Sequence, residues 1–226
     1  MDQRILAYYK QYQLDRFVSV DWIDQFKIRH FEKGESICEL ERPIDMLYFF
    51  VEGRAKVFLP MENARQLLLC FYDPLQLFGD LEIFEPEPLS TTTVEALTSC
   101  VCLSLPREFV LNCLATNPVF LKQLSLSLGR KLSRVIRNSA LNLLHPLEDR
   151  VASYILATAT TDQDHQLIFS GNLTQIADLL GTSFRHLHRT LQSFCDEGIL
   201  VKTKTTYTIR QPDELERRAG GVYVVT

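Results

Sequence analysis

The sequence predicts an α+β protein with three consecutive parts: a β-barrel or jelly-roll-like sandwich, one long helix, and a C-terminal unit in which two helices precede a β-hairpin. Short strand-forming runs alternate with turn residues from about position 28 to position 105, which is typical of a closed or two-layered antiparallel fold. An apolar repeat at helical spacing then begins at Asn117. We therefore expect three domains, at 1–116, 117–145 and 146–226.

The overall composition fits a chain that folds around one large or two small cores, because 46% of its 226 residues are hydrophobic. No stretch approaches the ~20 consecutive apolar residues of a membrane span. Residues 1–10 lack the apolar segment and cleavage site of a signal peptide. We therefore expect a cytoplasmic protein. Its net charge of −4 means that affinity for nucleic acid would have to come from a local cationic patch.

The six cysteines are spread along the chain without a C-x-x-C pair, so we expect no metal site. Cys100 and Cys102 would share one face of a strand, where packed thiols are commoner than a redox pair. The other cysteines are Cys38, Cys70, Cys113 and Cys195.

The first part combines a helical start with an acidic β region. Residues 1–27 are expected to be helical or mixed, with Trp22, Ile23 and Phe26 spaced for one face. Residues 28–105 contain thirteen Asp and Glu against six Lys and Arg, which gives a charge of −7. The strands predicted there are 36–40, 46–51, 55–59, 66–72, 92–97 and 99–105.

A short helix is predicted from Pro106 to about Leu114, and the long helix follows it. In the long helix, apolar residues recur at spacings of three and four, and its length of about 40 Å is large for one small domain. This favours a coiled-coil contact with a second copy through residues 117–143. Packing against its own barrel is the alternative. The repeat comprises Leu121, Leu124, Leu128, Leu132 and Val135, with interruptions at Lys131 and Asn138.

The long helix is also strongly cationic, because no acid occurs between Glu108 and Glu148. Attraction to the acidic barrel explains this charge, and an alternative is that the later arginines face a small anion. Leu144-His145-Pro146 then ends the helix and forms a candidate hinge. The cations are Lys122, Arg130, Lys131, Arg134 and Arg137.

Residues 172–198 are predicted to form two helices joined at Gly181, a residue that tolerates the left-handed backbone at a helix end. Thr182 and Ser183 are good N-caps for the second helix. At about 100° per residue, apolar side chains fall on one side of this helix and cations on the other. The apolar side comprises Leu187, Leu191 and Phe194, and the outer side comprises Arg185, Arg189 and Gln192, flanked by His186 and His188.

This outer side suits a helix that enters the DNA major groove, because arginine can bond guanine O6 and N7 together and cations near the helix start can meet phosphate. An ordinary amphipathic helix pair with a solvated charged face is the alternative. A β-hairpin follows from about residue 199 to 210. Its Lys202, Lys204 and Arg210 are placed to contact phosphate.

The order of barrel, long helix, hinge and winged helix-turn-helix resembles the cyclic-AMP receptor protein / fumarate-nitrate regulator (Crp/Fnr) family of bacterial transcription factors. The resemblance covers nearly the whole chain and implies a cyclic-nucleotide-binding-type β-roll. A weaker likeness to YeiL-type members rests on Phe-Arg-His-Leu at 184–187. The matching residues are Glu52-Gly53, Leu77 to Phe84, Asn117-Pro118, Arg150-Val-Ala, and the motif running from Ile176 through Gly181-Thr-Ser to Arg189-Thr-Leu.

The resemblance implies that the second helix reads the major groove. It assigns Ser183 to phosphate, Arg185 and Arg189 to bases, and Phe184 to a thymine methyl group. Family members usually carry arginine then glutamate where this chain has Phe184 and Arg185. We therefore do not expect the family's familiar half-site.

The effector region departs from the cyclic-nucleotide binders of the family. Their ribose-binding glutamate corresponds to Asp80, and their phosphate-binding arginine to the uncharged Ser90. Their purine-binding Thr-Ser corresponds to Val135-Ile136, which offers no polar group. Burying a phosphate without its cation is costly, so no cyclic nucleotide and no other named cofactor is predicted. A pocket for another effector would lie around Gly79, Asp80, Leu81, Ser90, Thr91, Val135 and Ile136, or side chains would fill it.

Together these features predict a homodimeric, sequence-specific DNA-binding transcription regulator that reads a palindrome, with RNA polymerase as a further partner. Activation and repression are not distinguished by the sequence. The alternative is a ligand-binding or protein-interaction module whose helix-turn-helix mediates other contacts. An enzyme is not expected, because no catalytic triad, phosphate loop or metal cluster stands out.

Overall fold

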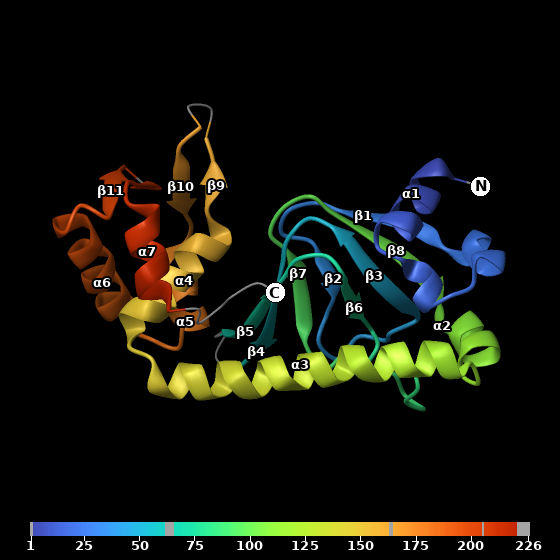
Figure 1. Cartoon of the computed structure of the whole chain (residues 1–226). Helices are drawn as coiled ribbons and strands as arrows, with labels where there is room; N and C mark the ends of the chain where they lie inside the picture. The colour runs from blue at the N-terminus through green and yellow to red at the C-terminus, as the bar shows by residue number, and fades with distance from the viewer. Residues whose placement is uncertain (1, 62–65, 163–164, 205, 221–226) are drawn as a thin grey trace. The chain divides into compact units, whose positions relative to one another are not determined.

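The computed structural model describes residues 2–61, 66–162, 165–204 and 206–220, and only the backbone of Val135 and of residues 137–144. The chain folds into two compact units (Figure 1). The first comprises Met1–Val57 and Tyr72–Val135, and the second comprises Phe58–Phe71 and Ile136–Thr226.

Two four-stranded sheets form the β-roll, with strand orders β1-β8-β3-β6 and β2-β7-β4-β5. The strands β1, β3, β6 and β8 pair antiparallel with their neighbours. The bounds are β1 Lys27–Phe31, β2 Ser36–Cys38, β3 Met46–Glu52, β4 Ala55–Pro60, β5 Gln66–Tyr72, β6 Gln76–Phe78, β7 Thr93–Ala96 and β8 Cys100–Pro106.

The strand β8 lies between β1 and β3, so it is buried along almost its whole length. Ser104 faces Lys27 on one side and Tyr48 on the other. At the β3–β4 turn, Gly53 has a φ of +98°, and a Cβ there would lie 2.5 Å from the carbonyl oxygen of Ser99. The Glu52-Gly53 signal therefore marks a turn that only glycine fits.

All six predicted strands are present, and β1 and β6 are two further strands that were not predicted. The strand β1 shows no clear alternation of buried and exposed residues, and β6 has three residues, so neither carries the period-two pattern. Buried thiols accompany the strands, as expected for Cys100 and Cys102. Burial raises the pKa of the Cys38 thiol to about 12, which keeps it protonated.

The helical start packs on this roll. Tyr12 donates from its hydroxyl to the Val51 carbonyl at 2.7 Å, and Trp22 lies edge-on to Phe109 at 5.6 Å. Ile23 and Phe26 are buried, as predicted. The elements flanking the strands are α1 Gln3–Gln11, η1 Leu14–Arg16, η2 Val20–Gln25, α2 Arg107–Phe109 and η4 Val110–Leu114.

The long helix α3 spans Pro118–Leu144, in agreement with the prediction. The side-chain oxygen of Asn117 accepts from the backbone N–H of Val119 and Phe120, at 2.9 and 3.2 Å, so Asn117 caps the helix start. Figure 1 shows the part of α3 that belongs to the first unit running along the β-roll. Its buried face comprises Phe120, Leu124, Lys131 and Arg134.

The predicted apolar seam of α3 needs correction. Leu124 is buried within the chain's own fold, Leu121 and Leu128 are half-buried, and only Leu132 is largely exposed. The helix therefore packs part of the predicted seam against its own β-roll, and Val135 has no described side chain. Among the side chains of α3 that the structure describes, the large apolar ones that are exposed are Val119, Leu126, Leu132 and Ile136.

In the second unit, helices pack with a four-stranded sheet of order β11-β12-β10-β9. Tyr154 lies 5.7 Å from Phe71 and 6.2 Å from Phe169, and Phe169 lies 6.0 Å from Tyr207. These rings form the centre of the unit. Its elements are α4 Leu147–Thr158, β9 Thr160–Thr161, β10 Leu167–Ser170, α5 Leu173–Leu179, α6 Phe184–Asp196, β11 Leu200–Thr203, β12 Thr206–Ile209 and α7 Pro212–Ala219.

The helix α7 had no counterpart in the sequence analysis, although its ends carry clear signals. Pro212 stands at its start and Asp213 and Glu214 lie in its first turn. Gly220 ends it with a φ of +55°.

Among the residues that the structure describes, no helix is both long and apolar enough to cross a membrane. Nor does any group of three or more His, Cys, Asp or Glu within them suit a metal ion.

Candidate nucleic-acid interface

The first helix of the predicted motif, α5, is fixed at both ends. The side chain of Asn172 accepts from the N–H of Thr174 at 3.0 Å and caps the start. At the other end, Gly181 takes a φ of +63°. Arg150 of α4 donates from Nη1 to the Leu180 carbonyl at 2.5 Å. This bond satisfies a helix-end acceptor and sets α5 against α4.

The second helix, α6, begins at the predicted cap. Ser183 accepts a hydrogen bond from the N–H of His186 at 3.2 Å. Its hydroxyl hydrogen stays available for a phosphate oxygen. Leu187, Leu191 and Phe194 are at most 1% exposed. The helix is therefore held by its apolar side, and its orientation about its own axis is fixed.

The opposite side of α6 carries exposed cations. Arg185, His186 and Arg189 are exposed, and no ion pair joins either arginine to a carboxylate in the described part of the chain. The hydrogen bond to a carboxylate on this side of α6 comes from Gln192, about two turns beyond the helix start, which donates to Asp196 at 2.9 Å. The guanidinium groups are therefore free of local carboxylates, as reading of base edges requires.

Phe184 opens α6 with half of its surface exposed. Its ring lies 6.0 Å from the half-buried ring of His188. His188 therefore supports Phe184 more than it reaches outward. An exposed aromatic ring at the first turn suits contact with a thymine methyl group.

The predicted hairpin is formed by β11 and β12, which pair from Leu200–Ile209 to Thr203–Thr206. Lys204 is exposed at the turn with a φ of +53°. Lys202 lies 5.8 Å from the centre of the Tyr207 ring. These two lysines and the exposed Arg210 place positive charge on the hairpin, where it can meet phosphate.

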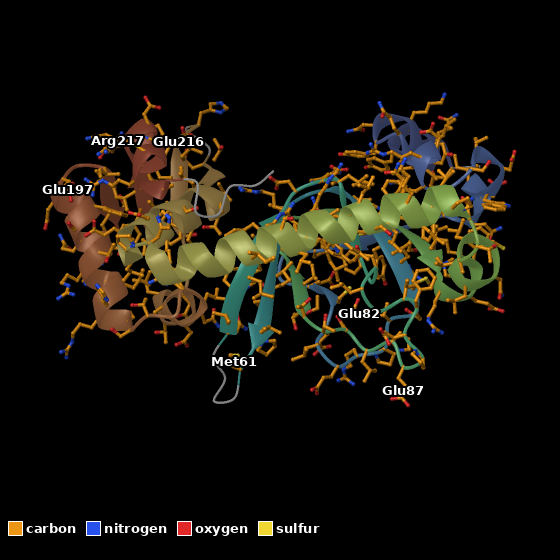
Figure 2. All side chains as sticks on the ribbon, turned by 60° about the horizontal axis from the view of Figure 1, so that its bottom comes forward. Met61, Glu82, Glu87, Glu197, Glu216 and Arg217 are labelled. Carbon is orange, nitrogen blue, oxygen red and sulfur yellow. The ribbon has the colours of Figure 1, made fainter. Side chains whose placement is uncertain are left out.

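The helix α7 braces the far end of α6. Arg218 of α7 bonds Glu197, which follows α6, and also Glu214 at 3.0 Å. Its guanidinium lies 5.5 Å over the Phe194 ring. The hydrogen bonds from Arg217 and Arg218 lower the pKa of Glu214 to about 2. Figure 2 shows Glu197 and Arg217 within this unit. Glu197, which follows α6, is thus engaged by α7, whereas Asp196 bonds Gln192 of α6 itself.

The predicted effector region holds a buried ion pair that the sequence analysis did not foresee. Lys131 of α3 donates from Nζ to Asp80 Oδ1 at 2.5 Å and to the Leu77 carbonyl at 2.6 Å. Asp80 Oδ2 is buried with no hydrogen-bond partner in the described residues. Burial raises the pKa of Asp80, and Lys131 opposes that rise. The one signal of this ion pair in the sequence is Lys131 itself, a charged residue within the apolar repeat of α3.

The other predicted positions bond within the chain, are exposed, or have no described side chain. Glu82, in the β6–β7 connection (Figure 2), accepts from the N–H and hydroxyl of Thr91 at 3.0 and 2.7 Å. Ser90 donates to the Thr92 carbonyl at 2.8 Å. At Gly79, with φ of +81°, a Cβ would lie 2.7 Å from the Met46 carbonyl. Leu81 is half exposed, and the side chain of Val135 is not described. Ile136 belongs to the second unit.

The cyclic nucleotide-binding domain family matches residues 28–117, and the Crp-like helix-turn-helix domain matches residues 149–218. The regulatory protein YeiL of Escherichia coli O157:H7 is 29% identical over 189 residues, which cover 84% of each chain. This chain belongs to the Crp/Fnr family of DNA-binding transcription regulators. A CRP-like cAMP-activated global transcriptional regulator of Mycobacterium tuberculosis is also 29% identical over 194 residues, 84% of this chain and 86% of that one.

Solved Crp/Fnr structures share the fold. A CRP-family transcriptional regulator from Thermus thermophilus superposes with a TM-score of 0.70 at 21% identity, covering 88% of this chain and 100% of that one. The predicted fold class, with its β-roll, long helix and winged helix-turn-helix, is therefore confirmed.

The residues at the positions that the Crp/Fnr resemblance assigns to a cyclic nucleotide form bonds within this chain. The carboxylate of Asp80, at the ribose-binding position, is bonded to Lys131. Ser90, at the phosphate-binding position, carries no charge and donates to a backbone carbonyl. Glu82, which bonds Thr91 next to Ser90, would place a buried carboxylate near a phosphate there, and this disfavours an anion.

Proposed function

We propose that this Crp/Fnr regulator binds a palindromic DNA site as a homodimer, and does so without a cyclic nucleotide. Each copy places α6 in a major groove, and two such helices about one helical turn, or ~34 Å, apart read the two half-sites. The protein works in the cytoplasm, where a bound dimer near a promoter meets RNA polymerase. Its relatives are transcription regulators, and we infer no enzymatic activity.

The main support for this proposal is the exposed, cationic outer face of α6. Its side chains Arg185 and Arg189 are exposed on a helix whose other side is fully buried. A guanidinium gains base specificity only when its helix is held rigidly, because bidentate bonding to guanine depends on orientation. We therefore assign base contacts to Arg185 and Arg189. Phosphate contacts are assigned to Ser183, His186, Lys202 and Lys204, and a thymine methyl contact to Phe184, supported by His188.

Support for the homodimer comes from α3. Its residues Leu126, Leu132 and Ile136 expose between 45% and 62% of their surface. They lie on the side of the helix opposite the buried face, by helical spacing. Three large apolar side chains exposed along one helix favour burial against another copy of that helix.

The experiment that tests DNA reading compares Arg185→Ala and Arg189→Ala with the unchanged chain on a duplex selected from random DNA. Each variant is expected to lose about 1–3 kcal/mol of specific binding free energy, measured by fluorescence anisotropy at fixed salt. Arg29→Ala, which removes an exposed arginine from the β-roll, is the matched control and should bind as before. Unchanged affinity in both α6 variants would mean that α6 does not read the bases.

A further inference from the structure

The ammonium group of Lys131 lies in a site that has the features of a cation receptor. Two oxygens contact it, from Asp80 at 2.5 Å and from the Leu77 carbonyl at 2.6 Å. The rings of Tyr72 and Phe78 lie 5.8 and 6.0 Å from it. A carboxylate, a carbonyl and two aromatic faces are the groups that bind an alkylammonium ion.

Burying the charges of Lys131 and Asp80 carries a large desolvation penalty. The Lys131 side chain is 10% exposed and that of Asp80 is 1% exposed, so both charges have lost their water. A buried ion pair of this kind is commonly no more stable than apolar residues of similar volume. Lys131 also stands on the buried face of α3, which includes Phe120 and Leu124, and apolar side chains in place of both partners of the ion pair would be no less stable. Stability alone therefore does not explain the lysine.

The ion pair does fix position. Lys131 lies on α3, whereas Leu77 and Asp80 lie on β6 and directly after it. Moving α3 along or around its axis would separate the two buried charges and leave each without its partner. The free-energy cost of this is far larger than that of sliding one apolar surface over another. One turn further along, Arg134 lies 4.8 Å over the ring of Tyr72 and strengthens the same attachment.

We propose that Lys131 is a built-in ligand of the β-roll, whose ammonium occupies the place of a small effector and holds α3 in the DNA-binding arrangement. This inference rests on the proposed function and names its regulation. Binding to DNA is then constitutive with respect to small anions, because an anionic effector would have to separate Lys131 from Asp80. The chemical class that the site accepts is a primary alkylammonium.

The test is chemical rescue of the full-length Lys131→Ala protein. This variant removes three methylenes and the ammonium, which n-propylammonium restores. The variant is expected to unfold at lower temperature and to bind the selected duplex about tenfold or more weakly, because Asp80 is left unpaired. Millimolar n-propylammonium, the range expected for so small a ligand, should raise both Tm and affinity. The neutral n-propanol should not.

Two variants serve as controls. Lys122→Ala removes an exposed lysine from the same helix and should match the unchanged chain. Lys131→Met keeps the side chain as far as Cε without its charge, so it shows the role of the ammonium if Lys131→Ala folds poorly. The inference is overturned if both Lys131 variants bind DNA within about twofold of the unchanged chain, a change too small for a lost buried ion pair.

It is also overturned if propanol rescues as well as propylammonium, since filling space would then suffice. The rise in Tm of Lys131→Ala with propylammonium needs no DNA. If the unchanged chain binds no selected duplex, the proposed function fails, and the amine-dependent Tm still decides whether the cation site exists.

Discussion

At the scale of single residues, the position of each charge decides what it can do. Arg185 and Arg189 lie on the exposed side of α6 without local acidic partners in the described ranges, whereas Arg150 and Arg218 bond groups of the protein itself. The first two arginines can therefore exchange water for DNA, and the other two stabilise the unit that presents them. Arginines of the same formal charge can thus have two roles in one domain, DNA contact and stabilisation of the fold.

Glu214 provides a pH-dependent test of the brace between α7 and α6. Arg217 and Arg218 lower its pKa from 4.5 to about 2. A lowered folded-state pKa stabilises the fold fully above the unfolded-state value, and this contribution is lost as the pH falls from about 4.5 towards 2. Glu214→Gln should therefore lower Tm at neutral pH, and the gap from the unchanged chain should close in acid.

Thermal unfolding of both proteins across this pH range gives the measurement. Glu216→Gln, at an exposed position of the same helix (Figure 2), is the control and should have a small effect at every pH. A gap for Glu214→Gln that stays constant down to pH of about 2 would contradict the assigned ion pairs.

At the scale of elements, α3 has two faces with different tasks. One packs on the β-roll through Phe120, Leu124 and Lys131. The other exposes Leu126, Leu132 and Ile136. Leu126→Glu or Ile136→Glu should weaken self-association, because a charge would be buried at the interface of two copies.

Analytical ultracentrifugation of these variants measures the effect, and DNA affinity should fall with it because two half-sites need two copies. Val20→Glu, which places a charge on an equally exposed apolar position in η2, should leave the assembly unchanged. A protein that sediments as a monomer both before and after the substitutions would rule out the proposed dimer.

The elements also show what the sequence could predict. Long periodic segments were predicted well: the strands β3, β5 and β8, the helix α3 and the two helices of the DNA-reading motif. The short β1 and β6 carry no usable period, and α7 was missed despite its terminal signals. The apolar seam of α3 was assigned to a partner although part of it packs inward, because periodicity shows which residues share a face but not what covers that face.

Part of the candidate site could be predicted from the sequence and part could not. The outer face of α6 follows from local spacing, so Arg185 and Arg189 could be placed from the sequence. The pairing of Lys131 with Asp80 joins residues 51 positions apart, so no local pattern reveals it. The departures at Asp80 and Ser90 predicted that a cyclic nucleotide would fit poorly, but not that a lysine fills the region.

At the scale of the whole molecule, a net charge of −4 means that DNA binding depends on a local cationic surface. We propose that the Lys131–Asp80 ion pair holds α3 without a cyclic nucleotide. Adding cyclic AMP should therefore change affinity for the selected duplex by less than about twofold, a negligible coupling free energy. Anisotropy titrations with and without cyclic AMP measure this. A large gain in affinity would show that the region opens for the nucleotide.

We propose above all that two copies of α6 read two half-sites of one DNA duplex. Selection of bound sequences from random DNA, followed by sequencing, tests it most directly. We expect an enriched palindrome whose half-site centres lie about 10 base pairs, or one helical turn, apart, and loss of that enrichment with Arg185→Ala. Recovery of unrelated sequences, or of a single unpaired half-site, would contradict it.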